Sequence, residues 1–281
     1  MKKWLKRLLL LVIIIVMVQM IGALLSRLPM GERVAVLKVK GAIVDPDRIV
    51  AKVQQAKEDK SIKALVLRVD SPGGSVGASQ EIYRSLEEFK SSGKPLVVSM
   101  GNVSASGGYY ISSPADVIFA NPGTITGSIG VIVQHTEVKD LLEKVGIKTT
   151  AIKTGKFKDT LSPLKSLTEE EKEYIQNTIQ DAYEQFIQAV LKHRAKKISE
   201  QKLREIADGR IFTGKVAKEL GLVDELGNLQ DAINRAKKLA NVPDARVFYM
   251  EERKGFFRRL LEEDFQGFTN HYTFMLYYMM K

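Results

Sequence analysis

The sequence lacks cysteine altogether and has only three histidines and one tryptophan among its 281 residues. Without cysteine, the chain cannot form disulfide bonds, thiolate metal sites or a cysteine nucleophile. With three histidines, it has few candidates for histidine-based acid–base catalysis. Acidic residues are also missing from the first 27 positions, which hold five lysines or arginines.

The net charge of +10 does not indicate a nucleic-acid partner, because half of it belongs to those first 27 residues. Beyond them, lysines and glutamates are interspersed as on an ordinary solvated surface. No interleaving of arginines with aromatic residues suggests RNA binding. Hydrophobic residues make up 44% of the chain and charged residues 27%, which is enough for a packed globular core.

The longest apolar run covers residues 8–25, "LLLLVIIIVMVQMIGALL", and is interrupted only by Gln19 and Gly22. As a helix rising about 1.5 Å per residue it would extend about 27 Å, close to the thickness of a bilayer core. The alternative is a cleaved signal peptide, whose apolar region usually has about 7–15 residues. The run is too long for that, and "IGALLSRLP" offers no small-x-small cleavage site. Basic residues precede the run, which predicts a single-pass anchor in the cell membrane with a cytoplasmic N-terminus and an extracytoplasmic remainder.

Apolar, valine-rich segments alternate with amphipathic segments from residue 34 onward. This alternation is typical of βαβ units and predicts an α/β fold with a mainly parallel sheet. The predicted strands are 34–44, 62–70, 95–101, "ADVIFANP" and 128–134. From Thr168 to about residue 241 the pattern is helical, and its first helix begins with a capping box that pairs Thr168 with Glu170. A strand at "ARVFYM" follows, and the tail "HYTFMLYYMMK" is too short to span a bilayer, so we expect it to pack on the protein as a strand or tail.

Three glycine-containing turns follow predicted strands: "DSPGGS" (70–75), "SASGGYY" (104–110) and "TGSIG" (126–130). Functional groups gather at the carboxyl ends of parallel strands. Gly73 and Gly74 can present their amides to an oxyanion without obstruction by side chains. Ser106 precedes a double glycine and a helix opening, where amides and the helix dipole favour developing negative charge.

A base for such a serine is harder to identify. No histidine lies near an acidic residue in a glycine-containing turn of this kind. A surface or packing role suits each histidine better. The histidines are His135, His193 and His271. A lysine can replace histidine in serine nucleophile systems. The segment "KTGKFKDTLSP" (153–163) offers three, and composition alone does not choose among them. They are Lys153, Lys156 and Lys158.

These motifs, together with "ANPGTITGSIGV" and "ADGRIFTGKVAKELGLVDELG", resemble the signal peptide peptidase A family of bacterial membrane serine proteases. The resemblance runs from about residue 34 to residue 242, in order and at the family spacing. It implies that Ser106, before the double glycine, is the nucleophile, and that Lys158, in "KFKD", is the general base. Ser104 and Ser112 fall outside the nucleophile position. Ser128 matches the serine that orients the lysine, and the matching oxyanion positions are Gly73, Gly74 and Gly107.

An ordinary lysine has a pKa of about 10.4 and is protonated at pH 7, so it cannot accept a proton. Making it neutral near pH 7 requires a shift of about three units, or roughly 4 kcal/mol, which burial in an apolar cleft can impose. The base assignment therefore demands a dry site around the lysine when substrate is bound.

The resemblance also implies a ClpP/crotonase-like fold of repeated β-β-α units with a C-terminal helical region. We divide the chain into a cytoplasmic N-terminus and anchor (1–27), a protease domain (28–242) and a C-terminal extension (243–281). Residual signal peptides and other hydrophobic peptides are the implied substrates, and no metal or cofactor is implied. The family further implies a homo-oligomeric ring, an octamer, in which the serine and the lysine of each site come from neighbouring chains. Two alternatives on the same fold are a crotonase-type acyl-CoA enzyme and a non-catalytic membrane scaffold.

Overall fold

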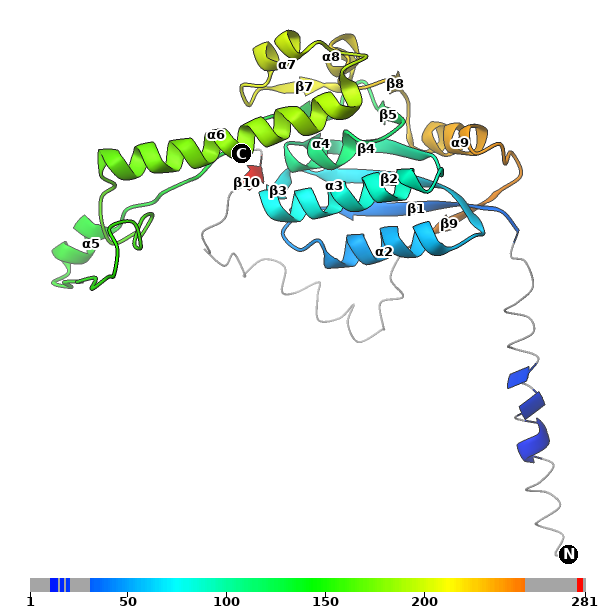
Figure 1. Ribbon diagram of the computed structural model, residues 1–281, viewed down its shortest axis with the longest axis horizontal. Helices are drawn as coiled ribbons and strands as arrows, with labels where there is room; N and C mark the ends of the chain where they lie inside the picture. The colour runs from blue at the N-terminus through cyan, green and yellow to red at the C-terminus, as the bar shows by residue number, and fades with distance from the viewer. Residues whose placement is uncertain (1–10, 15, 18, 21–30, 251–276, 280–281) are drawn as a thin grey trace, which may run out of the picture.

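A computed structural model describes residues 11–14, 16, 17, 19, 20, 31–250 and 277–279 (Figure 1). Most of the predicted anchor and most of the C-terminal extension lie outside these residues. Within the described ranges, no helix is both long and apolar enough to cross a membrane. The described fold is therefore that of residues 31–250, with one added strand at residues 277–279.

The described strands form an eight-stranded sheet and a separate two-stranded sheet. The larger sheet runs in the order β7-β6-β4-β2-β1-β9, and β5 and β8 branch from β4. Its strand pairs are all parallel except β6 with β7, which confirms the predicted α/β class with a mainly parallel sheet. The strands are β1 (Arg33–Lys40), β2 (Ile62–Ser71), β3 (Gly73–Ser75), β4 (Leu96–Ala105), β5 (Val117–Ala120), β6 (Ile125–Gly127), β7 (Ile211–Thr213), β8 (Glu225–Leu226), β9 (Arg246–Tyr249) and β10 (Tyr277–Met279).

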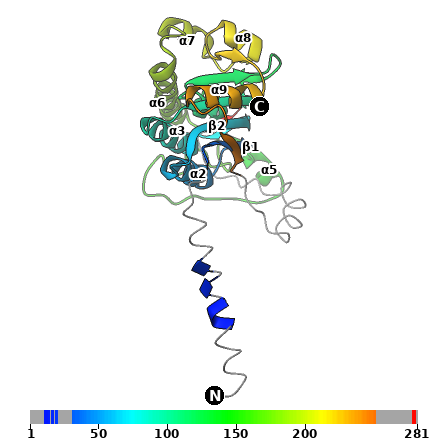
Figure 2. The same cartoon turned by 90° about the vertical axis from the view of Figure 1, so that its right-hand side faces the viewer.

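Helices cover both faces of the larger sheet (Figures 1 and 2). The side chains of β1 alternate between two buried clusters: Leu37 and Val39 pack toward α2, α3 and α4, whereas Val34 and Val36 pack toward α9. This period of two is the expected pattern for a strand buried on both faces. The helices are α2 (Asp47–Glu58), α3 (Val76–Ser91), α4 (Gly107–Ser112), α5 (Lys139–Lys144), α6 (Glu169–Arg194), α7 (Glu200–Ile206), α8 (Gly214–Glu219) and α9 (Leu229–Leu239).

The predicted capping box at Thr168 exists, but its partner is Glu171 and not Glu170. The Glu171 amide donates to the Thr168 hydroxyl, and the Glu171 carboxylate accepts from the Thr168 amide at 3.0 Å. A partner three residues into the helix reaches back over the first turn, whereas Glu170 points away and pairs with Lys156. The box fixes the start of α6, the long helix that extends beyond the body of the molecule (Figure 1).

The predicted strand at 128–134 was wrong. The strand in this region is β6, which ends at Gly127. Ser128 follows with φ of 52°, a left-handed conformation that turns the chain out of the sheet. Residues 131–168 then form an arm, which contains α5 and leads to the outer end of α6, and α6 runs back to the body (Figure 1).

The C-terminal tail contributes a strand, as predicted. β10 pairs antiparallel with β3, so that Tyr278 lies opposite Gly74 and Met279 opposite Gly73. The other edge of β3 is bound to residue 43, whose amide donates to the Gly73 carbonyl at 2.8 Å. β3 is therefore paired on both edges, and one of its partners is the end of the chain.

Candidate active site

Ser106 lies at the junction between β4 and α4 and has an unusual backbone. It is the N-cap of α4, with φ of 53° and ψ of −118°. Non-glycine residues rarely adopt positive φ, and each costs roughly 1–3 kcal/mol that the surrounding structure must supply. The side chain is 1% exposed, and no described residue hydrogen-bonds its hydroxyl. Such a strained turn between a strand and a helix is one way to hold a serine hydroxyl in a fixed direction.

Ser128 lies beside Ser106 because β4 and β6 are parallel neighbours. Ala105 is opposite Gly127 in the sheet, and the Ser106 amide donates to the Gly127 carbonyl at 2.8 Å. The Ser128 amide donates to the Arg210 carbonyl at 2.8 Å, which fixes the second left-handed serine. The structure therefore brings together two of the predicted site residues at the carboxyl ends of adjacent strands.

The predicted oxyanion glycines gather at the same edge. Gly107 supplies the first amide of α4, and the first amides of a helix have no partner within it. Gly108 packs against the turn after β2 so closely that a Cβ would lie 2.8 Å from the Ser71 carbonyl oxygen. At Gly74 a Cβ would lie 1.9 Å from the backbone oxygen of residue 43. Close backbone packing therefore requires a glycine at both positions, at Gly108 against the end of β2 and at Gly74 against residue 43.

The Gly73 amide is already engaged in this structure. It donates to the Ser71 hydroxyl at 3.1 Å, within the turn that joins β2 to β3. A developing oxyanion would compete with the Ser71 hydroxyl for the Gly73 amide. The oxyanion would be the stronger acceptor, because it is charged. Sequence reasoning missed Ser71. Its signal was the Ser-Pro-Gly order, because a serine hydroxyl commonly accepts from the amide two residues later in a turn.

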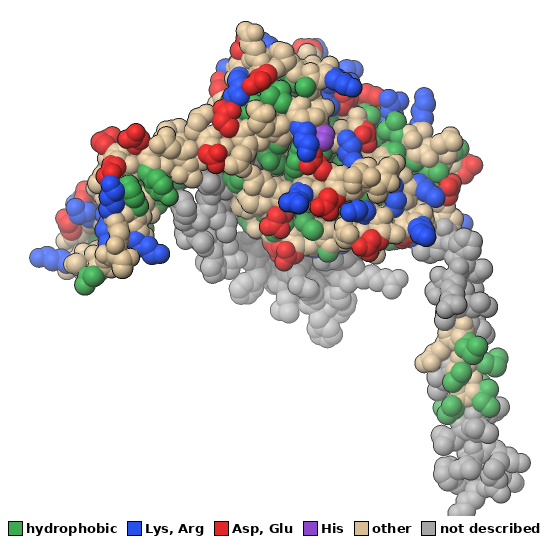
Figure 3. Space-filling view, viewed as in Figure 1, with side chains coloured by type: hydrophobic (Ala, Val, Ile, Leu, Met, Phe, Trp, Pro, Cys, Tyr) green, Lys and Arg blue, Asp and Glu red, His purple; other side chains and the backbone are tan. Residues whose placement is uncertain are grey.

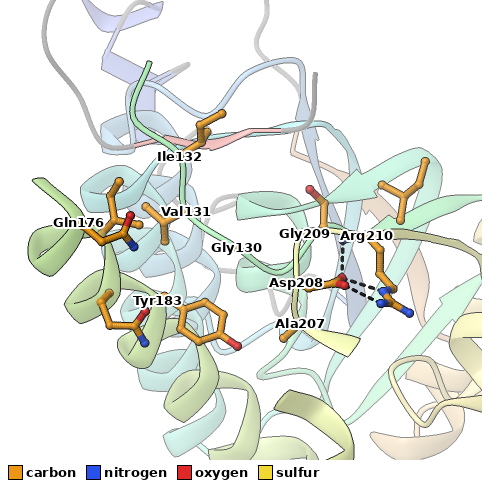
Figure 4. Close-up of a pocket in the computed structure, with 13 residues that line it drawn as sticks. Gly130, Val131, Ile132, Gln176, Tyr183, Ala207, Asp208, Gly209 and Arg210 are labelled. Carbon is orange, nitrogen blue, oxygen red and sulfur yellow. Dashed lines mark hydrogen bonds and ion pairs between the residues drawn. The ribbon is translucent and has the colours of Figure 1, made fainter. Parts of the chain in front are cut away.

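A cavity of about 930 Å³ opens next to Ser128, between α6 and the segment that precedes β7 (Figure 4). Tyr183 lines it from α6, and Asp208 and Arg210 line it from the opposite side. The Asp208 carboxylate accepts from the Arg210 guanidinium at 2.7 and 2.5 Å, and this ion pair lowers the pKa of Asp208 to about 2. The charges at the cavity rim therefore compensate each other, and Ser128 lies at its edge.

The arm carries all three lysines that the sequence left as candidates, and the structure distinguishes them. Lys153 donates to Asp159 at 2.5 Å, and Lys156 pairs with Glu170. Lys158 is exposed and has no ion pair or side-chain hydrogen bond with any described residue. A lysine base must lose its proton, which a paired carboxylate would oppose. Among the three, Lys158 is the one that pairs with no carboxylate of the described residues.

The structure does not bring Lys158 to Ser106 within one chain. The arm extends from the N-terminal end of α6, whereas α4 lies in the body of the molecule (Figure 1). Apolar side chains are exposed on this arm (Figure 3), among them Leu141 at 62%, Val145 at 63% and Ile152 at 98%. Exposed apolar groups in one contiguous segment are typical of interaction surfaces.

No described histidine hydrogen-bonds the Ser106 hydroxyl. Nε2 of His193 lies 2.7 Å from a Glu87 carboxylate oxygen, its ring packs edge-on against Tyr83, and burial lowers its pKa. His135 lies on the arm, and neither of its ring nitrogens has a described partner. His271 lies outside the described residues. No group of three or more metal-ligating side chains occurs in the part of the chain that the structure describes.

Comparison with known proteins identifies the family. The model of peptidase family S49 matches residues 88–243. A Synechocystis protein named as a protease is 44% identical over 84% of this chain and 85% of its own length. An Enterococcus faecium protein named as a signal peptide peptidase, SppA, is 36% identical over 80% of this chain and 69% of its own length.

Among solved structures, a mutant of the 1510-N membrane-bound stomatin-specific protease superposes with a TM-score of 0.52. The alignment covers 79% of this chain and 99% of that one at 16% sequence identity, so the likeness is one of fold. The fold and the family match together define a serine protease. The chain belongs to peptidase family S49, the family of signal peptide peptidase A.

Proposed function

We propose that this serine protease is an endopeptidase in which Ser106 is the nucleophile and Lys158 the general base. The observation that carries the proposal is the contrast among the arm lysines: Lys158 has no ion pair with any described residue, whereas Lys153 and Lys156 each pair with a carboxylate. The strained backbone of Ser106 and its position beside Ser128 support the nucleophile assignment. Ser128 would orient the lysine amine as it approaches the serine hydroxyl.

The chemistry follows from these positions. The Ser106 hydroxyl oxygen attacks the scissile carbonyl carbon while the neutral Lys158 amine takes the hydroxyl proton. The amide of Gly107, with those of Gly73 and Gly74, stabilises the carbonyl oxygen as it becomes negative. Collapse of the tetrahedral intermediate breaks the peptide bond, and the lysine returns the proton to the leaving amine. Water then hydrolyses the acyl-enzyme, with the lysine again accepting a proton.

The separation of the arm from α4 supports a site shared between chains. Each site would take Ser106 from one copy and Lys158 from the arm of the next, and a ring of eight copies would close the series. The exposed apolar residues of the arm would then be covered by the neighbouring copy. Burial in that interface would also supply the dry surroundings that a lysine base requires.

The pairing of β10 with β3 supports an extended peptide as the substrate. An extended segment adds to a free strand edge through main-chain hydrogen bonds, largely independently of sequence. The edge of β3 that faces away from residue 43 accepts such a segment, because β10 occupies it. We infer that hydrophobic peptides, such as residual signal peptides, bind along this edge with the scissile bond near Ser106.

The finer architecture belongs to the same proposal. We assign residues 28–242 to an extracytoplasmic protease domain with a ClpP/crotonase-like fold, and residues 1–27 to a cytoplasmic N-terminus and single-pass anchor. The apolar run at 8–25 and the basic residues before it support this topology. Residues 243–281 form the C-terminal extension.

A fluorophosphonate probe tests the nucleophile directly, because it reacts with activated serines and remains attached. The full chain in detergent should be labelled at one serine, and Ser106→Ala should abolish labelling. The controls are Ser99→Ala and Ser113→Ala, which remove other buried serines and leave the nucleophile in place. Labelling that persists in Ser106→Ala would overturn the assignment.

A further inference from the structure

A row of buried hydroxyl groups crosses three neighbouring strands just before the candidate site. Ser71 of β2 is opposite Ser104 of β4, and Ser104 is opposite Thr126 of β6. All three residues are 0% exposed. The earlier positions of β2 and β4 are mostly apolar, whereas the row places hydroxyl-bearing residues side by side across the sheet.

Each hydroxyl in the row bonds to backbone next to the site. Ser71 accepts from the Gly73 amide at 3.1 Å. Ser104 donates to the Gly108 carbonyl at 3.2 Å, and the Thr126 hydroxyl donates to the Ser104 carbonyl at 2.6 Å. Ser112 of α4 joins from the other side, because its hydroxyl also donates to the Gly108 carbonyl, at 2.7 Å, and lies 3.2 Å from that of Ser104.

The row therefore connects the sheet to both glycine turns that flank Ser106. Gly108 has no space for a side chain against Ser71, so these turns are positioned backbone to backbone. An apolar side chain of similar size would fill the interior without the cost of desolvating a hydroxyl. The hydroxyls instead fix the orientation of the backbone, since each hydrogen-bonds one peptide group of a glycine turn or of the strand end.

We propose that Ser71, Ser104, Thr126 and Ser112 are positioning residues that set the oxyanion-binding amides relative to Ser106. This inference rests on the proposed function, because it assigns these residues to the same site. An oxyanion donor acts only within about 2.7–3.1 Å of the developing charge. A misplacement of about 1 Å can lower the rate about a hundredfold. The row holds the Gly73 amide in one glycine turn and the Gly108 carbonyl in the other.

Ser104→Ala and Ser112→Ala test the proposal, and the chain offers a matched control for each. Ser99 lies on the same strand as Ser104, is also 0% exposed, and accepts from Arg68 at 2.8 Å, but it lies away from the site. Ser113 follows Ser112, is 0% exposed, and donates to the Tyr110 carbonyl at 2.8 Å. Each control therefore loses one hydrogen bond of a buried serine, whereas Ser104 and Ser112 each lose two, one of which they share.

Three readouts are measured on the full chain: kcat and KM for a fluorogenic peptide, the second-order rate of fluorophosphonate labelling, and the inhibition constant of a peptide aldehyde. We expect Ser104→Ala and Ser112→Ala to lower kcat and the labelling rate at least about tenfold, with KM nearly unchanged. Aldehyde affinity should fall in parallel, because the aldehyde adduct mimics the transition state. Ser99→Ala and Ser113→Ala should stay within about twofold of the original chain on all three readouts.

Ser112→Thr keeps the hydroxyl and should retain most activity, which a role in packing volume alone would not predict. Thermal unfolding of each pair identifies a variant that fails to fold, and Ser112→Ala then carries the test if Ser104→Ala is lost. Equal losses in site and control variants, or full activity in both site variants, would overturn the proposal. Failure of the proposed function gives a different result, because the original chain would then show neither turnover nor labelling at Ser106.

Discussion

Ser106 and Ser128 are two of the four non-glycine residues with positive φ in the described chain. A strained conformation persists only where the surrounding structure over-determines it, and such residues concentrate at functional sites. Here two hydrogen bonds from serine amides supply that constraint, one to Gly127 and one to Arg210. The strained backbone positions therefore include Ser106 and Ser128, the two serines that the sequence motifs indicated.

The choice among the arm lysines gives a prediction at the same scale. Lys158→Ala should abolish turnover without changing the thermal unfolding temperature, because the exposed Lys158 makes no described ion pair. Lys153→Ala and Lys156→Ala should retain most activity, since exposed ion pairs contribute only about 0–1 kcal/mol to stability. Activity of the three variants against one fluorogenic peptide checks this. Equal losses in all three would show that the segment matters for charge or structure and not through one base.

The sequence was sufficient for the serines but not for the whole site. A glycine pair after a strand marks a turn with open amides, which indicated Gly73 and the turn of Ser106. The family resemblance then selected Ser106 as the nucleophile and added Gly107. Ser71 could not be predicted, because its role depends on which strands are neighbours in the sheet. The same holds for the ion pair of Lys156, whose partner Glu170 lies in the first turn of α6.

Among the elements, α6 couples the arm to the body through Glu171. Its carboxylate accepts from Lys165 and from the Thr168 amide, and these bonds lower its pKa from 4.5 to about 2. The five longest strands of the sheet, β1, β2, β4, β5 and β9, were predictable because their apolar residues report burial in the sheet. The strand predicted at 128–134 was wrong, and the short strands β6, β7 and β8 were not predicted. The arm was not, because its apolar residues are exposed within the chain and no periodic pattern describes them.

Glu171 gives a prediction about acid stability. Because its folded pKa is below its unfolded value, its contribution is fully present above about pH 4.5 and is lost as the pH falls toward 2. Glu171→Gln should therefore lower the unfolding temperature at pH 6, and the difference from the original chain should shrink near pH 2. Thermal unfolding between pH 2 and pH 7 measures this, with Glu170→Gln as the exposed neighbouring control. A difference that stays constant over the range would contradict the assignment.

The pairing of β10 with β3 gives a second prediction about an element. Removal of residues 277–281 should raise kcat/KM for an added peptide severalfold, because it frees the strand edge at Gly73–Ser75. The gain should come through KM, since the chemical step is unchanged. Removal of Lys281 alone is the control and should have little effect. Unchanged KM after the longer deletion would show that substrate does not use this edge.

For the whole molecule, the proposed function would have each chain present half of a site at each of two places. The body carries Ser106, Ser128 and the glycine turns, whereas the arm carries Lys158 away from them (Figure 1). The α/β class followed from strand and helix spacing, and the family followed from five ordered motifs. The proposed assembly could not be predicted from residue spacing. An interface between chains shows in a single chain only as exposed apolar residues, which are common on protein surfaces.

Complementation between inactive chains tests the shared site most directly. Ser106→Ala and Lys158→Ala chains are co-expressed, and mixed rings are purified through two different affinity tags. If each site takes its serine from one copy and its lysine from the next, random mixing should restore about a quarter of the original activity. Each variant purified alone should be inactive. Verified mixed rings that stay as inactive as the separate variants would show that the site is built within one chain, and would contradict the account.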